Sequence, residues 1–444
     1  MGREAFFELG ADDQERALRH VLAAEREARS MRLSESEPAM NDHVAVIGGG
    51  HMGSGIAYVL LTAGYLVTII ESDSESCVRA QSNVHRLIDA SIQRNYITQP
   101  EGSDCRARLV VSSGYGGIAD VSVAIEAVYE DMQTKQSVFK MLETNVAQCA
   151  ILASNTSYLD LNEIASVLED PSRAIGLHFF APAHIMKLLE VIRGDATSER
   201  VISAALAIAR RLGKVPVLAG VCDGFIGNRI VARYREAADS LLLDGALPWE
   251  VDQAMVSFGY PMGPYEAQDL SGLDIAYASR RRRDASRDPN RRYVSIADKM
   301  VESGRLGRKS GLGWYRYPTS REKQIDPQVE ALILEQSSLM AVSRTSFSPD
   351  EVQQRLVLAM INEAADILHE GIANCAADID LVTIFGYGFP RWRGGLMHYA
   401  DLIGVDEIVL RLESLRNQDP VVWVPSALLY SCAAENLKIS DYRA

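Results

Sequence analysis

Residues 43–57, HVAVIGGGHMGSGIA, decide how this chain begins to fold. The apolar run at its start predicts a short buried strand that leads directly into glycines. Gly48, Gly50 and Gly53 form a G-x-G-x-x-G pattern. In this pattern the first glycine allows a tight turn, the second lets a pyrophosphate approach the backbone, and the third lets a helix pack on the strand. The stretch therefore predicts a dinucleotide-binding turn, with the diphosphate on free N–H groups at the helix start.

The residues that follow complete the setting of this turn. A helix is expected at residues 55–62 and a second apolar strand at residues 66–70, with Glu71 at its end. A carboxylate there accepts hydrogen bonds from a ribose 2′-hydroxyl and repels a 2′-phosphate, so it predicts NAD rather than NADP. The alternative is that Glu71 is a solvated loop residue and that Asp73 or Arg79 sets the preference.

Further strands and helices alternate along the chain. Strands are expected at residues 109–111, 121–126 and 150–153, with helical segments between them, including residues 132–145. This alternation predicts a Rossmann-type, doubly wound parallel sheet. Glu130 and the SNTS block, residues 154–157, follow strands at the edge where such sheets bind ligands. Lys135 lies in the same neighbourhood, where it either reaches a ribose or phosphate or serves at the surface.

Residues 174–193, AIGLHFFAPAHIMKLLEVIR, place a histidine near a carboxylate in apolar surroundings. His178 is followed by two phenylalanines, Pro182 breaks the strand, and an amphipathic segment then brings in Glu190. A carboxylate that orients an imidazole is one way to build a general base. A histidine beside aromatic residues is also common in protein cores, so the blocks on either side must decide between the two.

Helical patterns replace strands after residue 217. Helices are expected at residues 225–243, 248–258, 265–277 and 350–370. This region also repeats itself. Residues 235–245 are echoed by 362–371, FGY at 258–260 by FGY at 385–387, and DLSGLD at 269–274 by DLIGVD at 401–406. Three landmarks in one order predict a duplicated helical unit, whose two copies pack as an internal pseudo-dimer.

The chain is thus expected to divide into four parts. These are an N-terminal helix and linker at residues 1–40, a Rossmann domain at 41–219, a first helical domain at 220–318, and its repeat at 319–444. The fold class is a Rossmann-type doubly wound parallel sheet followed by an all-α region of two repeated helical units. The N-terminal helix is either solvated or docked on the body.

Composition narrows the classes of function. The 444 residues carry a formal net charge of −14, with 47% hydrophobic and 23% charged residues, as in a soluble globular protein. The Arg-rich residues 279–293 are mixed with acids and predict a solvated loop, so nucleic acid is not an expected partner. The six cysteines are scattered without metal-ligand spacing, which predicts free thiols and no metal site. We see no export signal, membrane span or peroxisomal tripeptide, and expect a cytoplasmic protein.

Eight blocks together resemble the 3-hydroxyacyl-CoA dehydrogenase family, and most closely the dehydrogenase portion of the multifunctional β-oxidation enzymes. In chain order they are VIGGGHMGSGIA, EAVYEDMQTKQSVF, SNTSYLDLNEIA, GLHFFAPAHIMKLLEVIRG, CDGFIGNRI, FGYPMGPYEAQDLSGLD, GRLGRKSGLGWYRY and FGYGFPRWRGG. The N-terminal helix resembles the linker that follows the enoyl-CoA hydratase domain of those enzymes. These residues leave no room for that domain, so a separate hydratase is a candidate partner.

The resemblance implies NAD-dependent oxidation of (S)-3-hydroxyacyl-CoA to 3-oxoacyl-CoA. It implies that His178 is the general base, that Glu190 orients it, and that Ser157 and Asn228 hold the 3-oxygen and the thioester end of the substrate. The cofactor-binding residues implied by the motif and the resemblance are Gly48, Gly50, His51, Met52, Gly53, Glu71, Glu130, Lys135 and Asn155.

Some features depart from the family or leave alternatives open. Ala181 stands where relatives commonly have Asn or Ser. The segment 82–108 resembles the CoA-contacting region but has no lysine, so Arg86, Arg94, Arg106 or Arg108 must meet the CoA phosphates. An acyl-carrier-protein thioester is therefore an alternative substrate.

Two other classes of protein remain. A dehydrogenase for another β-hydroxyacid or a nucleotide sugar needs a lysine or cysteine centre, which we do not expect beside SNTS or GFIGN. The other is a non-catalytic NAD-binding protein, against which the retained polar residues speak. The internal pseudo-dimer is compatible with a monomer or a homodimer.

Overall fold

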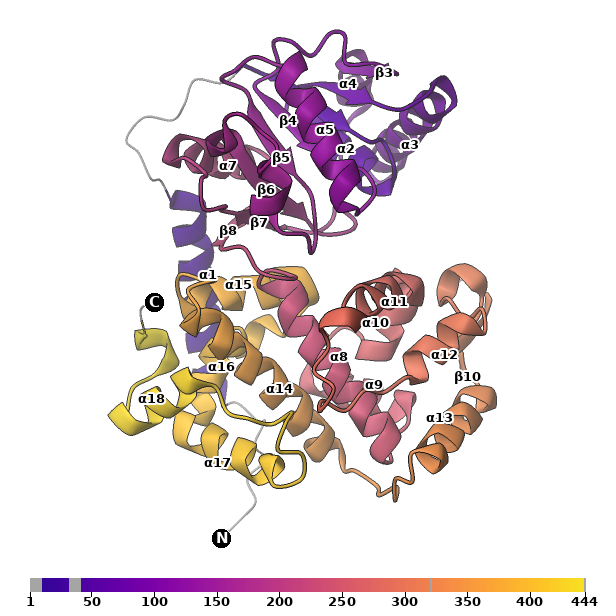
Figure 1. Ribbon diagram of the computed structural model, residues 1–444, viewed down its shortest axis with the longest axis vertical. Coiled ribbons are helices and arrows are strands. Elements are labelled where there is room, and N and C mark those ends of the chain that lie inside the picture. Colours follow the sequence, from indigo (N-terminus) through magenta and orange to yellow (C-terminus); the bar gives the residue numbers. More distant parts are fainter. Residues whose placement is uncertain (1–9, 32–40, 320–321, 443–444) are drawn as a thin grey trace. The chain divides into compact units, whose positions relative to one another are not determined.

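The computed structural model describes residues 10–31, 41–319 and 322–442 (Figure 1). Two compact units emerge, and each is described by itself. The first, here called the sheet body, consists of Arg19–Asn228 and Glu370–Tyr387. The second, the helical body, consists mainly of Arg229–His369 and the segment that begins at Gly388. A short piece of the predicted second helical repeat thus belongs to the sheet body. The four-part division into domains stays a prediction.

The sheet body is built on one eight-stranded sheet, in the order β3-β2-β1-β4-β5-β6-β7-β8. Its strands are β1 (His43–Ile47), β2 (Leu66–Ile70), β3 (Leu109–Ser112), β4 (Val123–Glu126), β5 (Ile151–Ser154), β6 (Ala174–Phe179), β7 (Leu188–Ile192) and β8 (Val215–Ala219). The first six run parallel, and the strand order reverses between β1 and β4, which confirms the Rossmann-type topology. β7 runs antiparallel to β6, while β7 and β8 are parallel to each other.

Helices cover both faces of this sheet, and each face has its own core. One face packs against α2 (His51–Thr62), α3 (Ser74–Gln93), α4 (Gln99–Ala107) and α7 (Glu199–Arg211), and the other against α5 (Met132–Asn145) and α6 (Leu161–Ala165). Side chains alternate between the faces along a strand. Leu177 belongs to the first core and Ala174 to the second. The next residue after Leu177, His178, therefore points toward the α5 and α6 face.

The helix α15 (Ala376–Tyr387) and the part of α1 (Ala11–Ser30) from Arg19 onward complete the sheet body. α15 lies against β7 and β8. α1 buries Val21, Ala24 and Ala28, and His20 Nε2 lies 2.8 Å from Asp380 Oδ2 of α15. The N-terminal helix is thus docked, and the alternative of a solvated helix is wrong. Residues 1–9 and the expected linker at 32–40 lie outside the described residues.

The helical body contains most of the two predicted repeats. Its helices are α8 (Gly227–Asp244), α9 (Pro248–Phe258), α10 (Pro264–Ser271), α11 (Leu273–Arg282), α12 (Ile296–Glu302), α13 (Pro327–Leu339), α14 (Pro349–His369), α16 (Leu396–Ile403), α17 (Val405–Arg416) and α18 (Ala427–Glu435). α14 packs against α9 and α18. In the described residues of this body, the regular structure is helical apart from an antiparallel pair, β9 (Tyr315–Thr319) and β10 (Glu322–Ile325), which the sequence did not predict.

Two local expectations in this body are corrected. The helix predicted at residues 265–277 is broken at Gly272, whose φ of +99° is not helical. The following helix, α11, continues through Arg282, so the predicted Arg-rich loop begins later. Arginines of this segment form ion pairs with acids. Arg280 Nε lies 2.6 Å from Asp298 Oδ1, and Arg292 pairs with Asp244 at the same distance.

The two repeats use one matched aspartate in the same way. Asp269 accepts the backbone N–H groups of Trp314 and Tyr315 at 2.9 and 3.0 Å. Asp401, its counterpart in DLIGVD, accepts those of Ile439 and Ser440 at 2.7 and 3.2 Å. In each copy, a carboxylate at this position fixes a distant segment of chain.

Within the described ranges, no helix has the length and apolar character needed to cross a bilayer. The same part of the chain has no cluster of His, Cys, Asp and Glu that can hold a metal ion. The six cysteines are free thiols.

Candidate active site

The glycine-rich turn between β1 and α2 has the geometry that its pattern predicts. Gly48 has φ +92°, and a Cβ there would lie 2.8 Å from Ala127 O. A Cβ on Gly53 would lie 1.7 Å from Gly48 O, so only glycine lets the helix approach the turn. A Cβ on Gly50 would meet no atom within 4 Å. Gly50 thus faces open space at the helix start, which fits a diphosphate on the free N–H groups of His51 and Met52.

Glu71 closes the other side of this turn. Its Oε1 accepts the N–H of Gly49 at 2.6 Å. A pocket of about 480 Å³ opens here, lined by Gly49, Gly50, Glu71, Ser76, Val78, Arg79, Ser82, Asn83 and Arg86. Asp73 instead caps α3 by accepting the N–H of Ser76 at 2.8 Å, a hydrogen bond that lowers the pKa of Asp73 to about 2. Glu71, unlike Asp73, therefore lines the pocket. Arg79 also lines it and pairs with Glu75.

His178 and Glu190 face each other across the antiparallel pair β6 and β7. They are direct partners in the strand register, and His178 Nδ1 lies 2.6 Å from Glu190 Oε2. Both side chains are buried, with exposed fractions of 4% and 0%. A neutral imidazole that donates its Nδ1–H to this carboxylate has its lone pair at Nε2. The sequence placed Glu190 on an amphipathic segment. The structure places it on a strand, and this strand pairing sets the geometry of the pair.

The start of α8 holds the second oxygen of this carboxylate. Gly227 N–H donates to Glu190 Oε1 at 2.9 Å, and a helix N-terminus favours negative charge. Phe225, just before, has φ +50°, which is rare for a residue with a bulky side chain. Its ring centre lies 5.7 Å from that of His178, and the ring of Phe180 lies 4.5 Å away. The imidazole is therefore fixed by packing as well as by Glu190.

Ser157 and Asn228, which were predicted to hold the substrate, lie together. Asn228 Nδ2 donates to the backbone oxygen of Ser157 at 3.2 Å. Tyr387, at the end of α15, donates its hydroxyl to Asn228 Oδ1 at 2.7 Å. Asn155, from the same SNTS block, accepts the N–H of Phe179 at 2.9 Å and so ties this loop to the strand of His178.

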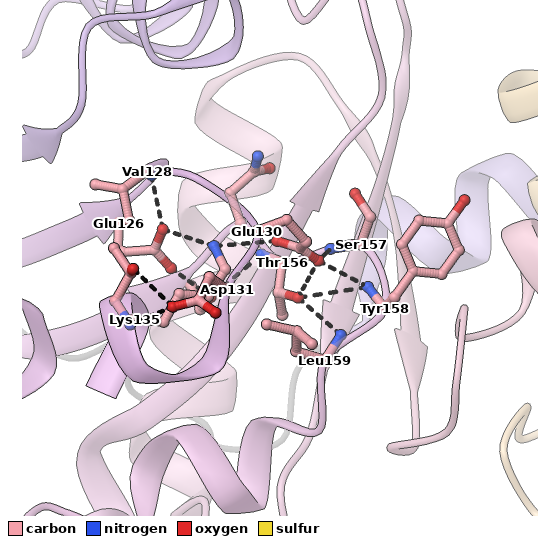
Figure 2. Close-up of polar contacts among 12 residues, drawn as sticks. Glu126, Val128, Glu130, Asp131, Lys135, Thr156, Ser157, Tyr158 and Leu159 are labelled. Atoms are coloured by element: carbon pink, nitrogen blue, oxygen red, sulfur yellow. Dashed lines mark hydrogen bonds and ion pairs between the residues drawn. The ribbon is translucent and has the colours of Figure 1, made fainter. Parts of the chain in front are cut away.

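A buried ion-pair network supports the loop of Ser157 (Figure 2). Lys135 Nζ lies 2.7 Å from Glu126 Oε1 and 3.2 Å from Glu130 Oε2. Glu130 Oε1 in turn accepts the Thr156 hydroxyl and the N–H of Ser157, at 2.6 and 2.8 Å. Burial alone would raise the pKa of Glu130, but the charge of Lys135 and these hydrogen bonds hold it below its ordinary value.

This network corrects one expectation. Lys135 is 1% exposed, so the alternative of a surface role is wrong. Lys135 lies near SNTS and Cys222 lies just before GFIGN, but neither was expected to be a lysine or cysteine centre. Lys135 is ion-paired, and Cys222 Sγ donates to Phe225 O at 3.3 Å. Both groups therefore have structural contacts. The sequence did not point to Glu126, whose only signal is a lone acid inside an apolar strand.

A second residue that the sequence missed is Lys214. It donates to Ala183 O and Met186 O at 2.5 and 2.6 Å and so holds the loop after Phe180. Burial lowers the pKa of Lys214 to about 8. This loop also contacts α2, the helix that follows the glycine-rich turn, because a Cβ on Gly55 would lie 3.2 Å from Ala183 Cβ.

Comparison with known proteins gives the family. Residues 43–222 match the NAD binding domain of 3-hydroxyacyl-CoA dehydrogenase. Residues 224–317, and again residues 352–429, match the C-terminal domain of the same enzyme. This chain belongs to the 3-hydroxyacyl-CoA dehydrogenase family. The double match confirms the duplication, and the NAD binding domain of this family identifies NAD as the cofactor.

Relatives extend the likeness within the 3-hydroxyacyl-CoA dehydrogenase family. The peroxisomal bifunctional enzyme of Cavia porcellus is 36% identical over 441 residues, which cover 94% of this chain and 60% of the relative. The dehydrogenase part of multifunctional enzyme 1 from C. elegans has a TM-score of 0.67 at 27% identity, and the match covers 97% of this chain and 99% of that one. The expected likeness to multifunctional enzymes is confirmed. The chain spans about 60% of the length of the first curated relative.

One family member is shorter. An (S)-3-hydroxybutyryl-CoA dehydrogenase from Ralstonia eutropha is 30% identical with a TM-score of 0.57, and its whole length matches 63% of this chain. That share is too small to contain the NAD binding domain together with both copies of the C-terminal domain.

Proposed function

We propose that this chain oxidises (S)-3-hydroxyacyl-CoA to 3-oxoacyl-CoA, reversibly and with NAD, and that His178 is the general base. The observation that carries the proposal is the buried contact of 2.6 Å between His178 Nδ1 and Glu190 Oε2. Both residues lie within residues 43–222, which match the NAD binding domain of 3-hydroxyacyl-CoA dehydrogenase.

The proposed chemistry follows from the tautomer of His178 that donates its Nδ1–H to Glu190. Oxidation of a secondary alcohol requires loss of the hydroxyl proton, which the free Nε2 of His178 accepts. Glu190, held also by Gly227 N–H, stabilises the imidazolium that forms. Bound NAD supplies the hydride acceptor. Ser157 and Asn228 hold the 3-oxygen and the thioester end, and Glu71 together with Gly50 binds the adenosine half of the cofactor.

The remaining cofactor-binding residues are Glu130, Lys135 and Asn155, of which the last two act indirectly. Glu130 lies in the loop between β4 and α5. Its side chain is 33% exposed and can reach a ribose. Lys135 is buried beneath it and acts by holding Glu130 in place. Asn155 acts in the same indirect way, through Phe179 N–H.

The acyl carrier is proposed to be CoA, with Arg86 and Arg94 as its phosphate contacts. Both are exposed, whereas Arg106 pairs with Asp89 and Arg108 with Asp104. Burial is the main cause that lowers the pKa of His184, and the positive charges of Lys214, His51 and Arg94 lower it further.

The test measures NADH formed from 3-hydroxybutyryl-CoA and longer homologues by the wild type and by His178→Ala. The variant is expected to lose a factor of about 10² to 10⁴, which is the usual contribution of general acid–base catalysis. His369→Ala, at the end of α14, is the control and should keep wild-type activity. Activity that survives His178→Ala would refute the mechanism.

The same assay separates the alternatives. Acyl-carrier-protein thioesters are tested in parallel, and faster turnover of these would move the substrate class away from CoA. Binding of NADH without turnover of any 3-hydroxyacyl thioester would favour a non-catalytic protein. The cytoplasmic location and the choice between monomer and homodimer stay predictions, and the Cavia porcellus relative is named as peroxisomal.

A further inference from the structure

We propose that Tyr387, from the second helical repeat, is a positioning residue for the amide of Asn228. This role rests on the proposed function, which gives Asn228 its substrate. Tyr387 donates its hydroxyl to Asn228 Oδ1 at 2.7 Å, and Asn228 Nδ2 donates to Ser157 O at 3.2 Å. The two contacts fix which end of the amide is oxygen and which is nitrogen. An amide has two N–H donors, so one N–H besides that given to Ser157 O can serve the substrate of the proposed function.

Packing holds the tyrosine in this position. Its ring meets the ring of Phe180 edge-on, with centres 5.6 Å apart and planes at 87°. A Cβ on Gly227 would lie 2.7 Å from Tyr387 Cε2, so the first residue of α8 must be small for the ring to fit. Phe180 also packs against His178. The tyrosine thus belongs to the same packed cluster as the base.

The matched tyrosine of the first repeat has different surroundings. FGY at residues 385–387 echoes FGY at 258–260, so Tyr260 corresponds to Tyr387. Tyr260 is buried among aromatic rings, and its hydroxyl lies 3.7 Å from Met360 Sδ. A thioether is a weak acceptor. The duplicated position is therefore structural in the first copy, while in the second copy its hydroxyl meets a residue of the candidate site.

This contact also assigns a role to the second copy in the reaction of the first. Asn228 lies in the first match to the C-terminal domain, and Tyr387 lies in the second. In this chain, both residues belong to the sheet body.

The test compares Tyr387→Phe with the matched control Tyr260→Phe. Tyr387→Phe keeps the ring and removes one neutral hydrogen bond, so kcat/KM for the thioester should fall by about 3- to 10-fold. The KM for NAD, the pH profile of kcat and the melting temperature should stay at wild-type values. Tyr260→Phe should leave all of these unchanged. An unchanged kcat/KM in Tyr387→Phe, or an equal loss in both variants, would overturn the role.

A double-mutant cycle then asks whether Tyr387 acts through Asn228. In an Asn228→Ala background, Tyr387→Phe should cost nothing further, because the group that it positions is gone. Asn228→Ser takes the place of Asn228→Ala if that variant fails to fold. Additive losses in an active enzyme would overturn the role of Tyr387 alone. A wild-type chain that turns over no 3-hydroxyacyl thioester would overturn the proposed function and this role with it.

Discussion

At the scale of single residues, the candidate site depends on buried charges that are each held by a specific partner. Glu126 has no exposed surface and accepts Lys135 Nζ, the Ser154 hydroxyl and the N–H of Val128, each at 2.7 Å. Removing the partner of a buried charge lowers the stability of the fold far more than removing the partner of an exposed charge. The loop of Ser157 therefore relies on an ion pair that touches no reacting atom in the proposed mechanism.

Lys135→Met should lower the free energy of unfolding by about 3 to 5 kcal/mol, because it leaves the Glu126 carboxylate buried and unpaired. Adding Glu126→Gln should restore part of that loss. Lys309→Met, which removes the exposed partner of Asp274, is the control and should cost less than about 1 kcal/mol. Urea unfolding measures all four proteins. A loss for Lys135→Met no larger than that of the control would contradict the buried pair.

Lys214 predicts a dependence of stability on pH. Burial lowers its pKa in the fold to about 8 from 10.5, so between these values the unfolded chain binds the proton and the folded chain does not. Stability therefore rises with pH across this window and levels off below about pH 8, where both states bind the proton. Lys214→Met has no such titration. From pH 7 to pH 9.5, the unfolding free energy of the wild type relative to this variant should rise by about 1 kcal/mol or more. A difference that stays flat, or falls, would contradict this prediction.

At the scale of elements, the matched aspartates give the motifs DLSGLD and DLIGVD the same structural role in the two repeats. Asp269 fixes the N–H groups at the start of β9 and also accepts the hydroxyl of Tyr317 at 2.9 Å. Burial raises its pKa to about 6, although these hydrogen bonds oppose the rise. The buried carboxylate of Asp269 therefore joins α10 to the hairpin of β9 and β10.

Asp269→Asn should lower the free energy of unfolding by about 1 to 3 kcal/mol, because an amide nitrogen then faces backbone donors. Asp274→Asn, in the same motif but in an exposed pair with Lys309, should change it by less than about 1 kcal/mol. Thermal or urea unfolding at pH 7 compares the two. Equal effects at the two positions would show that Asp269 does not hold the hairpin.

Elements with local signals were predictable, and those set by distant contacts were not. The strand at residues 66–70 and the helix at 248–258 match the structure because their patterns and caps lie within a few residues. The strand β7 was missed because its pairing with β6 is a matter of register rather than composition. Tyr387 was not recognised as a neighbour of Asn228, from which 159 residues of chain separate it. Only the FGY echo pointed to that position.

At the scale of the whole molecule, the division into two bodies cuts through the second repeat, because Glu370–Tyr387 belong to the sheet body. α15 comes from the second copy but packs on β7 and β8. A ligand that binds only the folded state stabilises the body that it contacts, by about 2.7 kcal/mol at 100 times its Kd.

Hydrogen–deuterium exchange with saturating NADH should therefore slow the amides of α15 together with those of β7 and β8. α10 and α11, which lie in the helical body, are the internal reference and should respond less. Peptide-level mass spectrometry resolves these segments. If α15 follows α10 and α11 instead of the strands, the division of the chain into these two bodies is wrong.

The duplication of the FGY position has a genetic consequence. In an assembly of identical one-copy subunits, any codon change at this tyrosine alters every role the residue has. Here two separate codons encode Tyr260 and Tyr387, so selection can act on the packing of one and the polar contact of the other independently. Sequence drift at the two positions is thus expected to differ among descendants of this gene, with the hydroxyl retained more strictly at Tyr387.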